Sequence, residues 1–209
     1  MLPDTPETRL LTELSSYADD LSEAAAAMDL ALEAGGESPL WPPLTGYAVV
    51  AYMRAFVHSN VRSGLLTHLE IPDDLAETHS MIRTYRNTTV AHSQSQLSLS
   101  LPLAALTAEG RVKTVVPITV RHNLPPSTAS RISQAIERIS ALVDDLTRPL
   151  TEQLSDKYSS ASPEMIATWP VPEVSQKDAE DFSAQSKRGR TPHFAVYWDV
   201  DLDGIEVVE

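Results

Sequence analysis

Apolar residues near the N-terminus recur every three or four positions, which is the spacing that places side chains on one face of a helix. The pattern predicts an amphipathic helix that Asp4 or Thr5 caps, that Pro6 opens and that Gly35-Gly36 ends. Its apolar stripe consists of Leu10, Leu14, Tyr17, Leu21, Ala24 or Ala25, Met28 and Leu32.

Two more helices are predicted before residue 93. One extends from about Thr45 to Leu69, and its first half is apolar on several faces, as in a central helix buried on more than one side. The next follows Ile71-Pro72, with Asp73 or Asp74 at its positive end, and is expected to continue to His92. The Pro-rich stretch 39–43 is predicted to be a rigid connector.

After residue 93 the spacing of apolar residues changes from a helical period to strict alternation. Serines alternate with leucines over 94–103, and a second alternating run follows over 112–120. With Ala108-Glu109-Gly110 as the turn, the pattern predicts a β-hairpin over about residues 95–121. Pro102 and Pro117 are expected to weaken its edges, because proline cannot donate a hydrogen bond to a sheet.

A last apolar stripe, from Ile132 to Leu146, predicts a helix from about residue 127 to Lys157, past Pro149. From Ser159 the chain becomes rich in Pro, Ser and charge, as linkers and partly ordered tails are. A strand is predicted from residue 193 to residue 200. We therefore expect a mainly α fold: an up-and-down helical bundle of about four helices with an inserted β-hairpin over residues 1–158, and an irregular C-terminal tail over 159–209.

The composition excludes several classes of functional site. The 209 residues include no cysteine, which excludes disulfides, thiolate metal sites and cysteine nucleophiles. No apolar run approaches the roughly 20 residues of a membrane span, and the N-terminus lacks the pattern of a secretory signal. We therefore expect a cytoplasmic protein with no membrane partner. No glycine loop of a nucleotide-binding type and no nucleophile elbow is present.

Charge restricts how nucleic acid could bind. The formal charge is −13, from 29 acidic and 16 basic residues, and such a field repels nucleic acid at long range. Any RNA binding must therefore come from a local basic surface. Residues 52–92 supply one candidate, because they hold four arginines and four histidines, namely Arg54, Arg62, Arg83, Arg86, His58, His68, His79 and His92.

Residues 85–93 read Tyr-Arg-Asn-Thr-Thr-Val-Ala-His-Ser. An arginine followed by a polar residue and then, several positions later, by histidine resembles the signature of the HEPN superfamily. These are small helical bundles, many of them metal-independent RNases in toxin–antitoxin and anti-phage defence systems. Residues 52–56, 71–75 and His79 extend the likeness to an abortive-infection-type subfamily, over about residues 10–155.

The resemblance implies a homodimer with a shared twofold site, RNA as substrate, an antitoxin or other protein partner, and neither cofactor nor metal. His92 would accept and return a proton near neutral pH. Arg86 would hold phosphate oxygens, and Asn87 would orient the histidine or the phosphate. On a regular helix Arg86 and His92 would lie about 120° apart around the axis and about 9 Å apart along it. Helical spacing suggests further substrate-binding residues at Arg54, His58, His79 and Arg83.

Alternatives remain open at this stage. An arginine and a histidine on a helix are often surface residues, and a histidine near a helix C-terminus is stabilised as a cation. The chain could then be a non-catalytic HEPN-fold module that binds a protein or a nucleotide. The run Lys187–Arg190 is a further basic segment, and residues 199–204 match the opening of a calcium loop, although the glutamate that would close it is missing.

Overall fold

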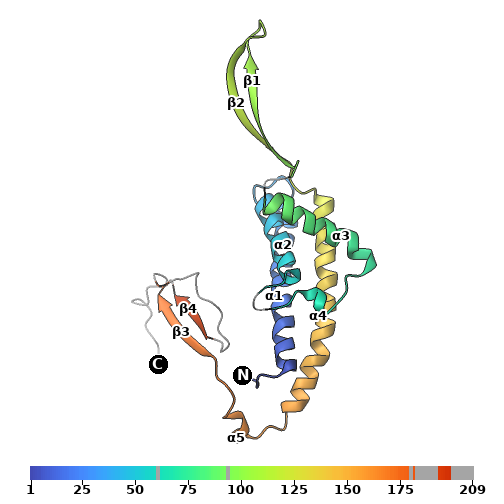
Figure 1. Cartoon of the computed structure of the whole chain (residues 1–209), viewed down its shortest axis with the longest axis vertical. Coiled ribbons are helices and arrows are strands. Elements are labelled where there is room, and N and C mark those ends of the chain that lie inside the picture. Colours follow the sequence, from blue (N-terminus) through green and yellow to red (C-terminus); the bar gives the residue numbers. More distant parts are fainter. Residues whose placement is uncertain (60–61, 93–94, 179–180, 182–192, 199–209) are drawn as a thin grey trace.

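The computed structural model describes residues 1–59, 62–92, 95–178, 181 and 193–198. Four helices form the body: α1 (Pro6–Ala34), α2 (Trp41–Phe56), α3 (Asp73–Tyr85) and α4 (Pro126–Tyr158). α1 packs against both α2 and α4, and α3 crosses the end of the body near α2 and α4 (Figure 1). The mainly helical fold with an inserted β-hairpin, predicted from the sequence, is confirmed.

The predicted first helix forms with the predicted ends. The Thr5 hydroxyl accepts a bond from the Thr8 N–H (3.3 Å), and the Thr8 hydroxyl accepts one from the Thr5 N–H (2.8 Å). This reciprocal cap satisfies two donors that a helix N-terminus otherwise leaves without partners. Gly35 then ends the helix with φ of 79°, a conformation that side chains rarely allow.

The core lies where α1, α2, α3 and α4 meet. Its largest fully buried side chains include Tyr17, Trp41, Tyr52 and Ile136. The indole N–H of Trp41 donates to the carbonyl of Leu124 at 2.8 Å, which ties the start of α2 to the segment just before α4. A buried indole needs such a partner.

The prediction of one helix from about Thr45 to Leu69 was wrong at both ends. Trp41 begins α2, and the prolines that follow it sit in the first turn, where a missing N–H is tolerated. The helix ends at Phe56, and the chain turns back so that a Cβ on Gly64 would lie 2.6 Å from the Phe56 carbonyl oxygen. A 3₁₀ turn, η1 (Leu65–Thr67), follows.

The third helix also differs from its prediction. The α-helical part stops at Tyr85, and the five residues Arg86–Val90 form a π-helix, η2. Pro72, not Asp73 or Asp74, occupies the N-cap position, and both acids lie in the first turn.

The predicted hairpin forms from β1 (Ser98–Leu106) and β2 (Val112–Arg121), which pair antiparallel. Gly110 occupies the turn with φ of 77°. The hairpin projects well beyond the end of the helical body (Figure 1). Nearly all of its residues are exposed.

The tail begins with a short helix, α5 (Pro163–Ile166), and holds two parallel strands, β3 (Glu173–Asp178) and β4 (His193–Trp198). The strand predicted from residue 193 is present over the described part, whereas the largely polar β3 was not anticipated. The basic run 187–190 and the calcium-loop candidate 199–204 lie outside the described residues. None of the described helices has the length and apolar content of a membrane span.

Candidate functional site

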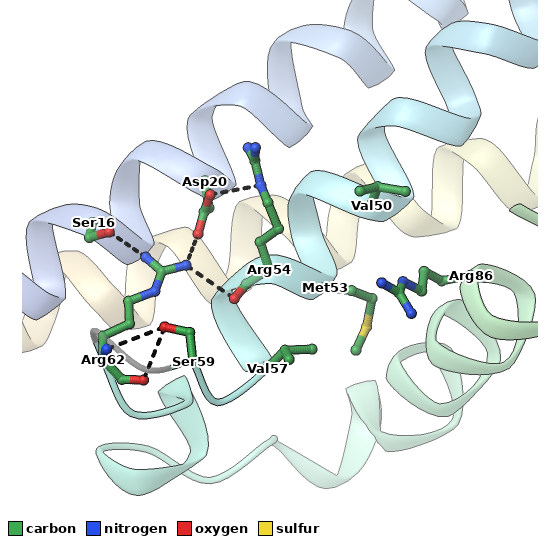
Figure 2. Close-up of a pocket in the computed structure, with 9 residues that line it drawn as sticks. All are labelled: Ser16, Asp20, Val50, Met53, Arg54, Val57, Ser59, Arg62 and Arg86. Atoms are coloured by element: carbon green, nitrogen blue, oxygen red, sulfur yellow. Dashed lines mark hydrogen bonds and ion pairs between the residues drawn. The ribbon is translucent and has the colours of Figure 1, made fainter. Parts of the chain in front are cut away.

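A pocket of about 330 Å³ opens where α1, α2, the turn after α2 and η2 meet (Figure 2). It contains two of the residues that the sequence singled out, Arg54 and Arg86. The full lining is Ser16, Asp20, Val50, Met53, Arg54, Val57, Ser59, Arg62 and Arg86. The pocket therefore combines three arginines with one carboxylate, a formal excess of two positive charges in a chain of net charge −13.

Two of the three arginines share the carboxylate of Asp20. The Arg54 Nε donates to Asp20 Oδ1 at 2.9 Å, and the Arg62 guanidinium pairs with Oδ2. Arg62 also donates to the Ser16 hydroxyl and to the Arg54 carbonyl, and its guanidinium lies 4.9 Å from the centre of the Tyr17 ring. Because Asp20 is only 8% exposed, this network fixes the wall of the pocket that α1 supplies.

The outer side of Arg54 is held by Glu23, which also accepts a bond from the Tyr47 hydroxyl at 2.6 Å. The pKa of Glu23 lies below its ordinary value because the hydroxyl of Tyr47 and the guanidinium of Arg54 both donate to it. Arg54 thus faces two carboxylates, and its charge is largely compensated before any ligand arrives.

Arg86 differs from the other two arginines, because no acidic side chain pairs with it among the described residues. Its Nη1 donates to the neutral Asn87 Oδ1 at 3.0 Å, and its Nε is buried with no hydrogen-bond partner. A buried donor without a partner is costly and calls for an explanation. Figure 2 places Arg86 across the pocket from the Asp20 network, so it is the lining cation that an anionic ligand can pair with.

Most residues of the π-helical turn at Arg86 are poor α-helix formers. Thr88, Thr89 and Val90 are β-branched residues that fit α-helices poorly, and the Thr88 hydroxyl donates back to the Thr84 carbonyl at 2.9 Å. The Ala91 N–H then bonds the Arg86 carbonyl, five residues back, at 2.9 Å. Such turns are frequent at functional sites.

The π-helical turn packs against α2 near Gly46. A Cβ on Gly46 would lie 3.8 Å from Val90 Cγ1, so the π-helical segment rests directly on α2. The contact holds Arg86 beside Val50 and Met53, the apolar residues of α2 that line the same pocket.

The other two predicted catalytic residues lie beyond the pocket lining. Asn87 is exposed and holds Arg86 through the bond described above. His92 follows η2, is exposed, and has no side-chain hydrogen bond or ion pair in the described part of the chain. A single chain therefore does not bring His92 into the pocket that contains Arg86.

His79 is placed inside the edge of the core. Its Nδ1 lies 3.0 Å from the Tyr52 hydroxyl, and its ring meets the Phe56 ring edge-on at 4.5 Å. Burial, with a smaller effect of the nearby Arg83 charge, lowers the pKa of His79 below its ordinary value. Burial likewise raises the pKa of Tyr52, so its hydroxyl keeps its proton and can donate to the imidazole.

His58 and Arg83 are both exposed, and neither lines the pocket. Of the four predicted substrate-binding residues, Arg54 alone shares the pocket with Arg86. Sequence reasoning counted Arg62 only as one of the four arginines of the basic stretch 52–92, and it gave no role to Asp20. One signal was available, because Asp20 stands three residues after Tyr17 and four before Ala24, within the buried face of α1.

Comparisons with protein-family models, with curated proteins and with solved structures find no significant match. Within the described residues, no group of three or more His, Asp or Glu is placed to hold a metal ion. The site is therefore characterised by its own geometry.

Proposed function

We propose that this chain is a metal-independent endoribonuclease of HEPN type, in which the pocket at Arg86 holds a phosphate of RNA. The observation that supports this most directly is that Arg86 lines a pocket of positive local charge and pairs with no carboxylate in the described chain, only with the neutral Asn87. A phosphate would supply the negative charge that this guanidinium lacks, and a guanidinium can bind two phosphate oxygens at once. The positive charge of the pocket also provides the local basic surface that RNA binding needs in a chain of negative net charge.

The chemistry needs only groups that the chain and the RNA possess. Neutral His92 takes the proton from a ribose 2′-hydroxyl, and that oxygen attacks the adjacent phosphorus. The bond from phosphorus to the 5′-oxygen breaks, and the leaving oxygen receives a proton from an imidazolium. Arg86 stabilises the extra charge on the phosphate oxygens during the transfer. The products are a 2′,3′-cyclic phosphate and a 5′-hydroxyl.

The separation of the two groups on one chain favours a homodimer. Arg86 lines the pocket whereas His92 stands outside it, so we propose that each site pairs Arg86 of one copy with His92 of the other across a twofold axis. The monomer would then bind phosphate but cleave poorly. As a defence effector or toxin, such an enzyme would be expressed with a protein that restrains it.

Cleavage of labelled RNA in excess EDTA tests the proposal. Wild-type protein should cleave and leave cyclic-phosphate ends, and His92→Ala should not cleave at all. Arg138→Ala is the matched control, because Arg138 is an exposed arginine of α4 that does not line the pocket. Cleavage that EDTA abolishes, or that His92→Ala retains, would refute this function.

A second candidate is a phosphate-binding module of the same fold without turnover. It is favoured by one observation, namely that the pocket lining contains arginines and hydroxyls but no imidazole. In that case RNA or a nucleotide binds to the wild type at low salt, Arg86→Ala weakens the binding, and no cleavage accompanies it.

A further inference from the structure

One face of the β-hairpin consists of aliphatic side chains. The antiparallel register pairs Leu99 with Val120, Leu101 with Ile118 and Leu103 with Val116. Because directly opposed residues point to the same side of a sheet and alternate residues share a face, these six side chains form one continuous apolar surface. It contains no charged residue and no hydrogen-bonding side chain.

This apolar face is open to solvent. Leu99, Leu101 and Leu103 are 47%, 43% and 44% exposed, and no helix or further strand of the described chain covers them (Figure 1). An isolated two-stranded hairpin is marginally stable in water and normally needs a third strand or a packed face. The projecting hairpin therefore lacks the packing that an ordered hairpin of this length requires.

A third strand is disfavoured at both edges. Pro102 and Pro117 stand directly opposite each other in the middle of the two strands. Neither proline has an N–H. At this position of the ladder the N–H of any other residue would point away from the partner strand, so each outer edge of the hairpin lacks a hydrogen-bond donor at its centre. Strand addition at either edge is therefore disfavoured, which leaves packing on the apolar face.

We propose that the hairpin is a dimerisation arm, whose apolar face packs on the same face of a second copy of this chain. The occupant must be as apolar and as flat as the face itself. The exposed large apolar residues of the described helices, such as Leu30, Leu40 and Leu66, are dispersed over different elements. An identical hairpin is the matching surface, and a twofold axis makes such a face complementary to itself.

The distribution of charge agrees with a second copy as the partner. Two chains of net charge −13 repel each other, and the acidic excess lies outside the hairpin, in the helical body and the tail. Residues 95–122 hold three basic side chains (Arg111, Lys113 and Arg121) against one acid (Glu109). Each hairpin thus has a net charge of only +2 (three bases minus one acid), so two hairpins repel each other less than two acidic bodies would.

The arm also bears on the site. Ser98, the first residue of β1, lies six positions after His92. Pairing of the arms would draw the 86–92 segments of two copies toward the same axis, and this part of the inference rests on the proposed function. The pairing of the arms itself does not.

Sedimentation analysis of the full-length chain tests the arm. Leu101→Glu places a charge in the apolar face, whereas Ser100→Glu places the same charge on the opposite face of the same strand and is the matched control. We expect a dimeric wild type, a dimeric Ser100→Glu, and a dissociation constant raised about 30-fold or more in Leu101→Glu. A monomeric wild type at tens of micromolar concentration, or equal dimerisation of the two variants, would overturn the inference.

A second variant distinguishes loss of dimerisation from loss of folding. Residues 98–121 can be replaced by a short Gly-Ser linker, because Ser98 and Arg121 are paired neighbours at the base of the hairpin. This variant should keep the helical circular dichroism of the body and be monomeric, and a dimer of this variant would refute the arm. RNA cleavage is measured separately, so a dimer that depends on the arm but does not cleave refutes the proposed function and leaves the arm standing.

Discussion

The carboxylate of Asp20 and the guanidinium of Arg62 form an ion pair whose side chains are only 11% and 12% exposed. Two features follow from it. The pair anchors the turn after α2 to α1, and Asp20 together with Glu23, which pairs with Arg54, compensates two of the three positive charges around the pocket. Arg86 is then the arginine of the lining that has no carboxylate partner in the described chain.

Removing Asp20 should destabilise the fold. In Asp20→Ala, Arg62 would remain largely buried beside Arg54 without a counter-charge, and breaking a buried pair in this way costs about 3 kcal/mol. Urea unfolding followed by circular dichroism measures the loss. Asp19→Ala, at the exposed neighbouring position on α1, is the control and should change the free energy of unfolding by less than about 0.5 kcal/mol. Equal effects of the two variants would argue against the anchoring role.

Arg86 should account for a distinct part of the salt dependence of RNA binding. If Arg86 contacts one phosphate, then Arg86→Ala should lower the slope of log affinity against log salt by about 1 and weaken binding at low salt. Arg138→Ala should leave the slope closer to that of the wild type, because Arg138 is an exposed arginine of α4 that does not line the pocket. Titrations of single-stranded RNA at several salt concentrations measure both slopes. If the two variants behave alike, the pocket is not where RNA phosphate binds.

His79 should make stability fall with acidification near pH 6. Its pKa lies below the ordinary value of 6.5 in the folded chain, because burial and the Arg83 charge disfavour the imidazolium. Between the unfolded and the folded pKa, the unfolded chain binds a proton that the folded chain does not, so the free energy of unfolding decreases as the pH falls below 6.5. His79→Gln should flatten this part of the profile, measured by urea unfolding from pH 8 to pH 5. A profile with the same slope in wild type and variant would contradict the assignment.

Two glycines should respond oppositely to alanine. Gly64→Ala places a Cβ 2.6 Å from the Phe56 carbonyl oxygen, a backbone atom that cannot move alone, and should cost about 2 kcal/mol. Gly46→Ala places one at an ordinary contact distance from Val90, within α2, where alanine is the better helix former. It should therefore be neutral or stabilising. Thermal unfolding of both variants compares them, and a tolerated Gly64→Ala would mean that the turn after α2 is not held at this close approach.

The sequence predicted the elements that local patterns specify. The first helix has a complete cap and a terminal glycine, and the hairpin has two alternating runs around Gly110. The end of α2 was missed because residues 57–63 continue no single period, and the contact that turns the chain back, Gly64 on Phe56, is a tertiary one. The π-helical turn was also missed, since β-branched residues lower helix propensity without specifying which turn replaces it.

The site was predicted in part. Arg54 and Arg86 meet in one pocket although they lie on different elements, whereas His79 belongs to the edge of the core. The role of Asp20 and Arg62 depends on α1 lying beside the turn after α2, which no short-range pattern encodes. His92 stays outside the pocket lining because it follows the end of η2, and no short-range pattern specifies where that turn ends.

The shared site is tested most directly by mixing two inactive variants, Arg86→Ala and His92→Ala, under conditions in which subunits exchange. Half of the dimers would then be mixed, and each mixed dimer would hold one intact site, so cleavage in EDTA should return to about a quarter of the wild-type rate. The wild type is assayed alongside. No recovery in the mixture while the wild type cleaves would contradict a site built from two copies, and no cleavage by a dimeric wild type would contradict the ribonuclease itself.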